Sequence, residues 1–492
     1  MKKLIVVCFA SFWMVNSVSA QKISTYKKKV LESIEVDFLM GYYEQEGNNA
    51  SVTGGIGTEK LNDITPTIVI KIPLNADAIL TVDVGISAYS SASSSNLDPF
   101  DASGASKNDD DDDDDDDDVD DDNDDGGGEP GKIQGSPWVE STGASKGDVW
   151  KSVSAKYSHF SDDRNTIFGL NASASSEYDY SSIGFGASVT KLFHEKNTEL
   201  GISGQVYLDT WHPKYPTELD SYIEAGQNLN NGFFADIDIL NQQGNAINKN
   251  GAIVWAPHSA NLISTEGRKT YSASLSFSQI LSENAQMSLF VDLVKQQGWL
   301  ANPMQRVYFS DKENYYVGNA ESITNYTSSS NTDVFHLADD IERLPTSRLK
   351  IPIGARLNYF LNESIVVKTY YRFYSDDWGI SAHTANIELP IKFSEGKYTF
   401  YPSYRYYRQT ASTYFAPYEQ HLSTEKYYTS DYDLSEFSSS QYGVGFKYVD
   451  IFSSFKILQL GLKSADIRYS SYTRNTGLKA NILTLGVKFV VD

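Results

Sequence analysis

The sequence of 492 residues contains one cysteine, Cys8, and no apolar run of about 18 residues after its first twenty positions. The lack of such a run excludes a helical membrane protein. Cys8 lies in a leader that we expect to be removed, so the mature chain would have no thiol. Disulfide frameworks, cysteine-ligated zinc and cysteine nucleophiles are therefore excluded.

The leader has the parts of a secretory signal peptide. Lys2 and Lys3 precede an apolar run at residues 4–15, and Val18 and Ala20 occupy the −3 and −1 positions of a cleavage site. We therefore expect a signal peptide at residues 1–20. Cys8 comes too early to be the acylated cysteine of a lipoprotein.

Tyrosine and glycine are abundant, with 33 and 34 residues respectively. Glycine weakens helices, whereas aromatic residues favour strands, so a helical bundle is not expected. The mean hydropathy of −0.39 is low. This value is compatible with a membrane-spanning β-barrel, because its strands alternate apolar and polar residues.

Negative charge is concentrated in one segment: the formal net charge is −23, and residues 109–125 contain fifteen aspartates. Like charges repel and offer no apolar surface to bury, so we expect a disordered, solvated loop at about residues 92–147. A hydrated surface brush is one interpretation. The other is a weak site for loosely bound Ca²⁺, although the ligand spacing of an EF-hand is absent. The carboxylates of that weak site would be Asp109, Asp110, Asp111, Asp112, Asp120, Asp121, Asp122, Asp124 and Asp125.

Alternating apolar and polar positions recur from Ile34 to the end of the chain. In the last segment Leu483, Leu485, Val487 and Phe489 share one face, as in the terminal strand of an outer-membrane barrel. We expect sixteen strands in all, starting near residues 34, 63, 78, 148, 165, 180, 198, 269, 286, 347, 364, 381, 397, 437, 455 and 477.

The lengths of the connections follow the parity of the strands. Seven short connections each lead from an even-numbered strand to the next odd one, whereas the long connections at about 92–147, 213–268, 300–346 and 410–436 follow odd-numbered strands. Bacterial barrels keep short turns in the periplasm and long loops outside. The pattern predicts an all-β fold: one antiparallel transmembrane barrel of about 16 strands at residues 33–492, preceded by a periplasmic segment at 21–32. The alternative is a soluble protein with several sheets.

The polar faces of these strands would line the lumen. Alternation places five basic side chains there from neighbouring strands, Arg356, Lys368, Arg372, Lys392 and Arg405, and three acidic ones from the first half, Asp37, Asp83 and Asp209. Opposed basic and acidic walls would create a transverse field that favours polar or zwitterionic solutes. Alternatively, these charges pair with one another or with an inserted loop and only stabilise a closed barrel.

Enzymatic motifs are absent. The seven histidines, including His212, His258, His336, His383 and His421 on the predicted outer side, form no known catalytic or metal-ligand spacing. We interpret them as solvated loop histidines, expect no catalytic residue and no enzyme, and assign no metal. A nucleic-acid partner is not expected, and loosely bound Ca²⁺ is the one cofactor considered.

Several segments resemble, in order, an uncharacterised domain-of-unknown-function family of Gram-negative outer-membrane proteins. They are residues 41–48, 52–59, 87–94, 296–303, 371–380, 404–411 and 430–435. The resemblance implies an outer-membrane β-barrel in contact with lipid, but no established activity. Members are often encoded beside a flavin-transferase and a small lipoprotein, which implies an envelope redox setting.

These observations lead to two functional hypotheses. The first is a barrel in the outer membrane of a Gram-negative bacterium that passes or captures a small polar solute or ion. The second is a non-conducting structural barrel that docks an envelope lipoprotein or redox partner.

Overall fold

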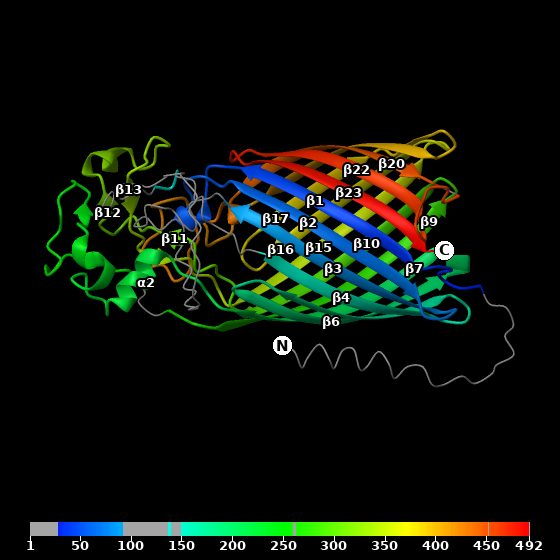
Figure 1. Cartoon of the computed structure of the whole chain (residues 1–492), viewed down its shortest axis with the longest axis horizontal. Helices are drawn as coiled ribbons and strands as arrows, with labels where there is room; N and C mark the ends of the chain where they lie inside the picture. Colours follow the sequence, from blue (N-terminus) through cyan, green and yellow to red (C-terminus); the bar gives the residue numbers. More distant parts are fainter. Residues whose placement is uncertain (1–27, 92–135, 139–148, 259–261, 451, 492) are drawn as a thin grey trace, which may run out of the picture.

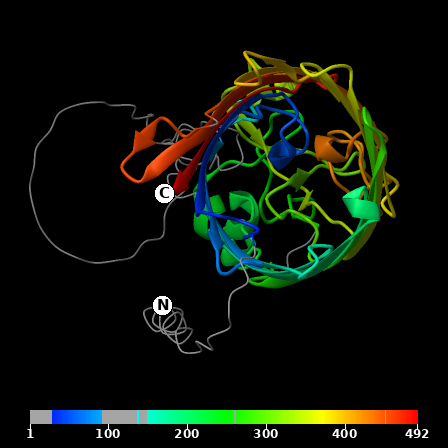
Figure 2. The ribbon, with the colours of Figure 1, turned by 90° about the vertical axis from the view of Figure 1, so that its right-hand side faces the viewer.

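Sixteen antiparallel strands cross the molecule and close into a barrel (Figures 1 and 2). The computed structural model describes residues 28–91, 136–138, 149–258, 262–450 and 452–491. Each strand pairs with its neighbours along the chain, and β1 (Glu35–Glu46) also pairs with β23 (Lys479–Val491), which removes the free edges. The predicted fold class and strand number are confirmed.

The remaining crossings have lengths suited to tilted membrane strands. They are β2 (Leu61–Pro73), β3 (Ala78–Ser91), β4 (Val149–Phe160), β5 (Thr166–Ser176), β6 (Tyr180–Phe193), β7 (Thr198–Trp211), β9 (Glu266–Ser282), β10 (Ala285–Gly298), β15 (Ser347–Phe360), β16 (Val366–Asp376), β17 (Ser381–Glu388) with β18 (Ile391–Phe393), β19 (Tyr398–Gln409), β20 (Phe437–Val449) and β22 (Leu460–Arg474). β17 and β18 form one crossing that is interrupted at Pro390, which has no N–H to donate. The short β21 (Lys456–Ile457) pairs only with the start of β22.

The period of two in the sequence places apolar side chains on the outside of the barrel. Leu289 and Leu293 of β10 and Ile353 and Leu357 of β15 are large, apolar and solvent-exposed. The alternate positions of the same strands face inward, where a Cβ at Gly354 would meet the ring of Phe290. An apolar exterior and a polar interior are what a barrel in lipid requires, since closure satisfies every backbone hydrogen bond.

The two ends of the barrel differ strongly. The seven short connections that lead from even-numbered to odd-numbered crossings lie at one end, together with the C-terminal end of β23 (Figure 1). The long connections lie at the other end, where residues 47–60, 212–258, 262–265, 299–346 and 410–436 fold together into a structure that we call the cap. The predicted parity of the connections is thus confirmed.

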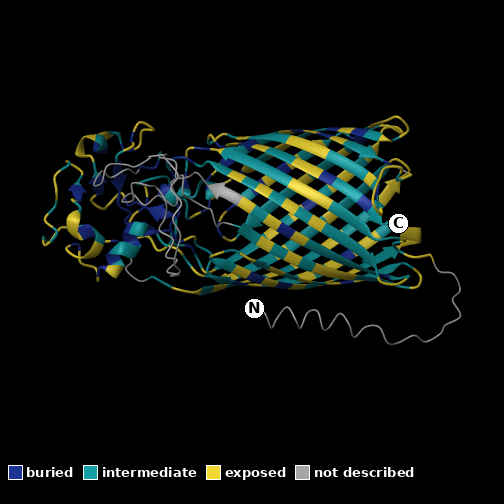
Figure 3. Cartoon of the chain, in the orientation of Figure 1, coloured by how far each residue is buried: buried dark blue, intermediate teal, exposed yellow. Residues whose placement is uncertain are grey.

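The cap has hydrophobic cores of its own, which the sequence analysis did not anticipate (Figure 3). Its main core includes Phe234, Trp255, Val317 and Phe335, all almost fully buried. The cap contains α2 (Thr217–Glu224), η1 (Ser51–Thr53), η4 (Gly232–Asp236), η5 (Ala320–Asn325), η6 (Tyr432–Leu434) and the short strands β8 (Leu240–Asn241), β11 (Arg306–Val307), β12 (Tyr315–Gly318), β13 (Val334–His336) and β14 (Asp340–Ile341).

The loop after β1 is fixed to the rest of the cap by glycines. Gly54 and Gly55 have φ angles of +79° and +91°, which other residues rarely adopt. A Cβ at Gly54 would also meet the ring of Tyr308, and one at Gly55 the carbonyl of Ser430. These two glycines therefore allow η1 to pack against the cap loops that follow β10 and β19.

None of the helices in the described part of the chain is long and apolar enough to cross a membrane. The predicted signal peptide at residues 1–20 and most of the predicted loop at 92–147 lie outside the described residues.

Candidate functional site

Four of the predicted lumen cations lie together on the inner face of the barrel. We call them the basic wall: Arg356 of β15, Lys368 and Arg372 of β16, and Arg405 of β19. Arg356 and Arg405 belong to one cross-strand row, which runs through Tyr370 and Asn386. Arg372 pairs with Gly354 and Thr384, one inward-facing position closer to the cap.

Aromatic rings hold Arg356 in place. Its guanidinium lies 5.6 Å from the ring centroid of Phe290 and 5.5 Å from that of Tyr370. The two rings are themselves stacked, with centroids 5.9 Å apart. Cation–π contacts orient the guanidinium without neutralising its charge.

Lys368 has the acidic partner that the sequence suggested. Its Nζ lies 3.3 Å from Glu388 Oε1, and Glu388 Oε2 accepts a hydrogen bond from Arg468 Nη1 at 3.1 Å. One carboxylate thus binds two cations, and Asp466, which lies 3.8 Å from Arg468, balances the charge of this group.

Arg372 and Arg405 differ from Lys368. Among the described residues, no carboxylate lies within ion-pair distance of either guanidinium, and Arg372 Nε is buried without a hydrogen-bond partner. Lys392, in β18 near the periplasmic end, is exposed and likewise has no ion pair in this part of the chain. The basic wall therefore carries positive charge that the described residues leave unneutralised.

The three predicted acidic residues do not form one surface. Asp37, near the periplasmic end of β1, lies 3.3 Å from Lys488 and 3.8 Å from Lys71. Asp209, near the cap end of β7, is bound by Arg268 at 2.6 Å. Asp83 lies in the middle of β3, which is eight strands from β16 and so on the opposite side of the barrel.

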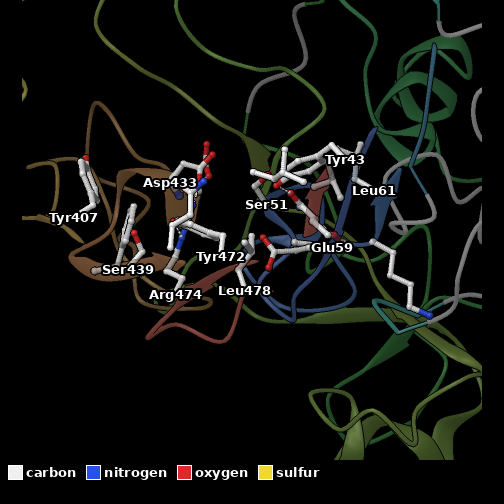
Figure 4. Close-up of a pocket in the computed structure, with 18 of the residues that line it drawn as sticks. Tyr43, Ser51, Glu59, Leu61, Tyr407, Asp433, Ser439, Tyr472, Arg474 and Leu478 are labelled. Carbon is white, nitrogen blue, oxygen red and sulfur yellow. Dashed lines mark hydrogen bonds and ion pairs between the residues drawn. The ribbon is translucent and has the colours of Figure 1, made fainter. Parts of the chain in front are cut away.

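A cavity of about 620 Å³ lies between the inner wall and the cap, and we call it the mouth cavity (Figure 4). The wall contributes Tyr43, Gln45, Arg405, Tyr407, Gln441, Tyr472 and Arg474, and the cap contributes Ser51, Glu59, Gln305, Asp431 and Asp433. A second cavity of about 520 Å³ is lined by Arg356, Lys368, Asn386, Glu388 and Arg405. Because Arg405 lines both, the two cavities are neighbours along the inner wall.

Three carboxylates surround the mouth cavity. Asp433 is bound by Arg474, with Nη1 2.8 Å from Oδ1, so its charge is compensated. Burial raises the pKa of Asp431 to about 6, and the charge of Asp433 adds to the increase. Burial also raises the pKa of Glu59. Gln305 Oε1 is buried and has no hydrogen-bond donor among the described residues.

Two of the histidines contradict the expectation of solvated loop residues. His336 and His421 are buried in the cap, with 0% and 3% exposure. His336 stacks on Tyr308 and Tyr316, with centroid distances of 4.2 and 4.6 Å, and burial lowers its pKa to about 3. His383 lies in strand β17 rather than in a loop. The expectation failed because it treated the long loops as solvated, whereas they form cores.

Within the described ranges, no group of three or more histidine, cysteine or acidic residues is arranged to hold a metal. The predicted weak cation site at residues 109–125 lies outside those ranges.

The cap residues of the mouth cavity, such as Glu59, Gln305 and Asp431, were not singled out from the sequence. A signal was present, because residues 52–59, 404–411 and 430–435 carry the family resemblance and all contribute to this cavity. Single positions in loops show no periodicity, so their convergence could not be read from a pattern.

Comparisons with known proteins give one matching family and several solved structures of low similarity. A family described as "Protein of unknown function (DUF3570)" matches residues 4–480. A bacterial polysaccharide outer membrane secretin is 8% identical over 94% of this chain and 99% of its own, with a TM-score of 0.41. OccK2 (OpdF) of Pseudomonas aeruginosa, solved with glucuronate, is 8% identical over 94% and 98%, with a TM-score of 0.37. A BenF-like porin from Pseudomonas fluorescens is 7% identical over 93% and 98%, with a TM-score of 0.36. The comparison with curated proteins gives no match.

Proposed function

The chain belongs to the DUF3570 family of proteins of unknown function, and from that premise we propose that it is an outer-membrane barrel of a Gram-negative bacterium that passes or captures small polar solutes carrying negative charge. The proposal assigns no catalytic step to any residue.

The unneutralised arginines of the basic wall are the observation that carries this proposal. Arg372 and Arg405 face the lumen and make no ion pair with the described residues. A charged group at a pore wall raises the local concentration of solutes of opposite charge. A barrel that served only as a scaffold would have no use for such charges, since each costs desolvation free energy unless it is paired.

The position of the mouth cavity supports a solute path. A solute entering from the cap side would meet the mouth cavity first and then Arg405, which also lines the second cavity with Arg356 and Lys368. The rings beside Arg356 keep that guanidinium at the wall. Successive cations along a wall allow a negatively charged solute to move between weak sites.

Single-channel recording in planar bilayers tests the proposal. We expect wild-type protein to conduct with a preference for anions, and the double variant Arg372→Gln, Arg405→Gln to shift the reversal potential toward cations. The matched control is Arg408→Gln. Arg408 is three residues from Arg405 in β19 but is exposed beside Glu436, so its loss should not change the reversal potential.

Two results would overturn the proposal that charged solutes pass through the lumen. One is the absence of conductance in both the wild type and the double variant. The other is an unchanged reversal potential in a double variant that is folded, as judged by its heat-modifiable migration in SDS gels.

One observation favours the second candidate function, docking of an envelope lipoprotein or redox partner. The periplasmic connection between β20 and β22 exposes Phe452 and Leu458 at 87% and 95%, with Phe455 also exposed. Large apolar groups exposed together often mark interaction sites. We expect a docking barrel to co-purify from outer membranes with a stoichiometric partner and to lose it in a Phe452→Ser, Leu458→Ser variant. Equal recovery in that variant would argue against this surface.

A further inference from the structure

Charged groups of both signs line the mouth cavity, and Figure 4 shows Glu59, Asp433 and Arg474 among them. Glu59 and Asp431 come from cap loops, whereas Arg405 comes from the barrel wall. The lining also includes the Arg474–Asp433 ion pair, Lys60 and uncharged polar groups such as Gln441 and Tyr472. The cavity is thus dipolar.

Two carboxylates on the cap side accept hydrogen bonds from backbone N–H groups. Glu59 Oε2 accepts the backbone N–H of Asn49 at 3.1 Å, and Asp431 Oδ1 accepts that of Asp433 at 2.9 Å. Neither carboxylate forms an ion pair with a described residue. Arg474 forms an ion pair with Asp433, and the other cations of the lining are Lys60 and Arg405. Gln305 Oε1 adds a buried acceptor with no donor among the described residues.

The strand register gives the distance along the barrel wall between Arg405 and the position of Glu59. Arg405 pairs with Gln441, then Tyr472, Ala480 and Gln45 follow in the same cross-strand row. Four inter-strand steps cover about 19 Å along the wall. Gln45 Nε2 donates to the carbonyl of Glu59 at 3.0 Å, which fixes Glu59 at the far end of this row.

The side chains of Arg405 and Glu59 reach into the cavity and shorten this separation. A complementary ligand then needs opposite charges about 10 Å apart, which is the end-to-end length of roughly three extended residues. A volume of about 620 Å³ accommodates such a molecule. A single amino acid is too short to reach both ends.

We propose that the mouth cavity binds short zwitterionic peptides, with the ammonium group at Glu59, Asp431 and Gln305 Oε1 and the carboxylate at Arg405. This inference rests on the proposed function, because it names the solute class that enters the lumen here. The carboxylate end of the peptide would then move to Arg356 and Lys368 in the second cavity.

Calorimetric titration of the full chain in detergent micelles tests the inference with three probes: trialanine, N-acetyl-trialanine and trialanine amide. We expect trialanine to bind at least about tenfold more tightly than either blocked form, since each loses a charge-assisted contact. Glu59→Gln should weaken trialanine but leave N-acetyl-trialanine unchanged, and Arg405→Gln should weaken trialanine but leave the amide unchanged. Arg408→Gln is the matched control.

Equal binding of all three peptides, or no heat with trialanine at about 10 mM, well above ordinary solute affinities, would overturn the inference. Asp431→Asn provides a second acidic variant if Glu59→Gln fails to fold by heat-modifiable migration. The bilayer recordings are independent of these titrations. Anion-selective conductance without peptide binding would therefore reject only the peptide site, whereas binding without conductance would reject the passage of solutes.

Discussion

Arg306 and Glu218 form a two-bond ion pair in the centre of the cap, with Nε 2.7 Å from Oε1 and Nη2 2.9 Å from Oε2. Their side chains are 1% and 0% exposed. Glu218 belongs to the loop after β7 and Arg306 to the loop after β10, and Arg306 Nη1 also donates to the carbonyl of Val52 at 2.9 Å. One guanidinium thus joins three cap loops above the mouth cavity.

We expect Glu218→Ala to destabilise the cap by about 3–5 kcal/mol, because Arg306 would remain buried without its partner. A Glu218→Leu, Arg306→Met double variant should recover much of this loss, since no charge is left buried. Hydrogen–deuterium exchange of the amides in α2 and β11 measures the effect, while the heat-modifiable migration of the barrel should not change.

The exposed pair Arg408–Glu436, at 3.3 Å, provides the control for this experiment. Arg408→Ala should change cap exchange by no more than about 1 kcal/mol. If Glu218→Ala had an equally small effect, the pair would not be what holds the loops together.

The stability of the cap should fall as the pH rises from about 4.5 to 8, because two carboxyl groups with raised pKa outweigh one histidine with a lowered pKa. Burial raises the pKa of Glu342 to about 8 and that of Asp339 to about 7, from 4.5 and 3.8. The folded cap retains protons that the unfolded chain releases, so these groups lower stability as the pH rises toward 8. His336 has the opposite effect: its pKa is lowered from 6.5 to about 3, so its contribution is lost as the pH falls below 6.5.

Between pH 6.5 and 8, of these three groups only the two carboxyl groups change the stability of the cap. Glu342→Gln should therefore flatten the alkaline limb of a cap stability profile measured by hydrogen exchange, corrected for intrinsic rates. His336→Phe, which keeps an aromatic ring between Tyr308 and Tyr316, should make this fall steeper between pH 4.5 and 6.5, because it removes the opposing contribution. An alkaline limb that persists in Glu342→Gln would contradict the assignment to that residue.

The barrel was predictable because its strands follow a periodic alternation of apolar and polar residues. Alternation from Leu483 to Phe489 and the parity of the connections specify strands, closure and sidedness without any information on tertiary contacts. The same alternation identified Arg356, Arg372 and Arg405 as lumen residues. Their inward direction follows once Ile353 and Leu357 are placed on the lipid side.

The cap and the mouth cavity were not predictable in this way. Arg306, Glu218 and Ala338 have no repeating pattern in the sequence, so only the folded cap brings them together. Polar loops with few apolar residues resemble solvated loops in a sequence. Phe234, Trp255 and Phe335 were the signal of a core, because aromatic residues at such positions need to be buried.

The aspartate-rich segment leads to a prediction that is independent of the cap. Deletion of residues 109–125 should leave the barrel folded, because that segment has no apolar surface to bury. Calcium titration should show weak binding, at about 1 mM, in the full chain and none in the deletion variant. Identical titrations of the two proteins would favour the hydrated brush over the weak cation site.

The last prediction concerns the contact between Phe290 and Gly354 in the lumen. A Cβ at position 354 would meet the ring of Phe290, so Gly354→Ala should push the ring away from the wall and into the pore. We expect a lower single-channel conductance. Phe290→Ala should have the opposite effect, because it removes the ring and leaves Arg356 only Tyr370 as an aromatic contact. In the double variant the new methyl group has no ring to displace, so its conductance should match that of Phe290→Ala alone. This non-additivity is the decisive measurement, since independent effects of the two substitutions would sum and would show that the ring does not rest on Gly354 in the membrane.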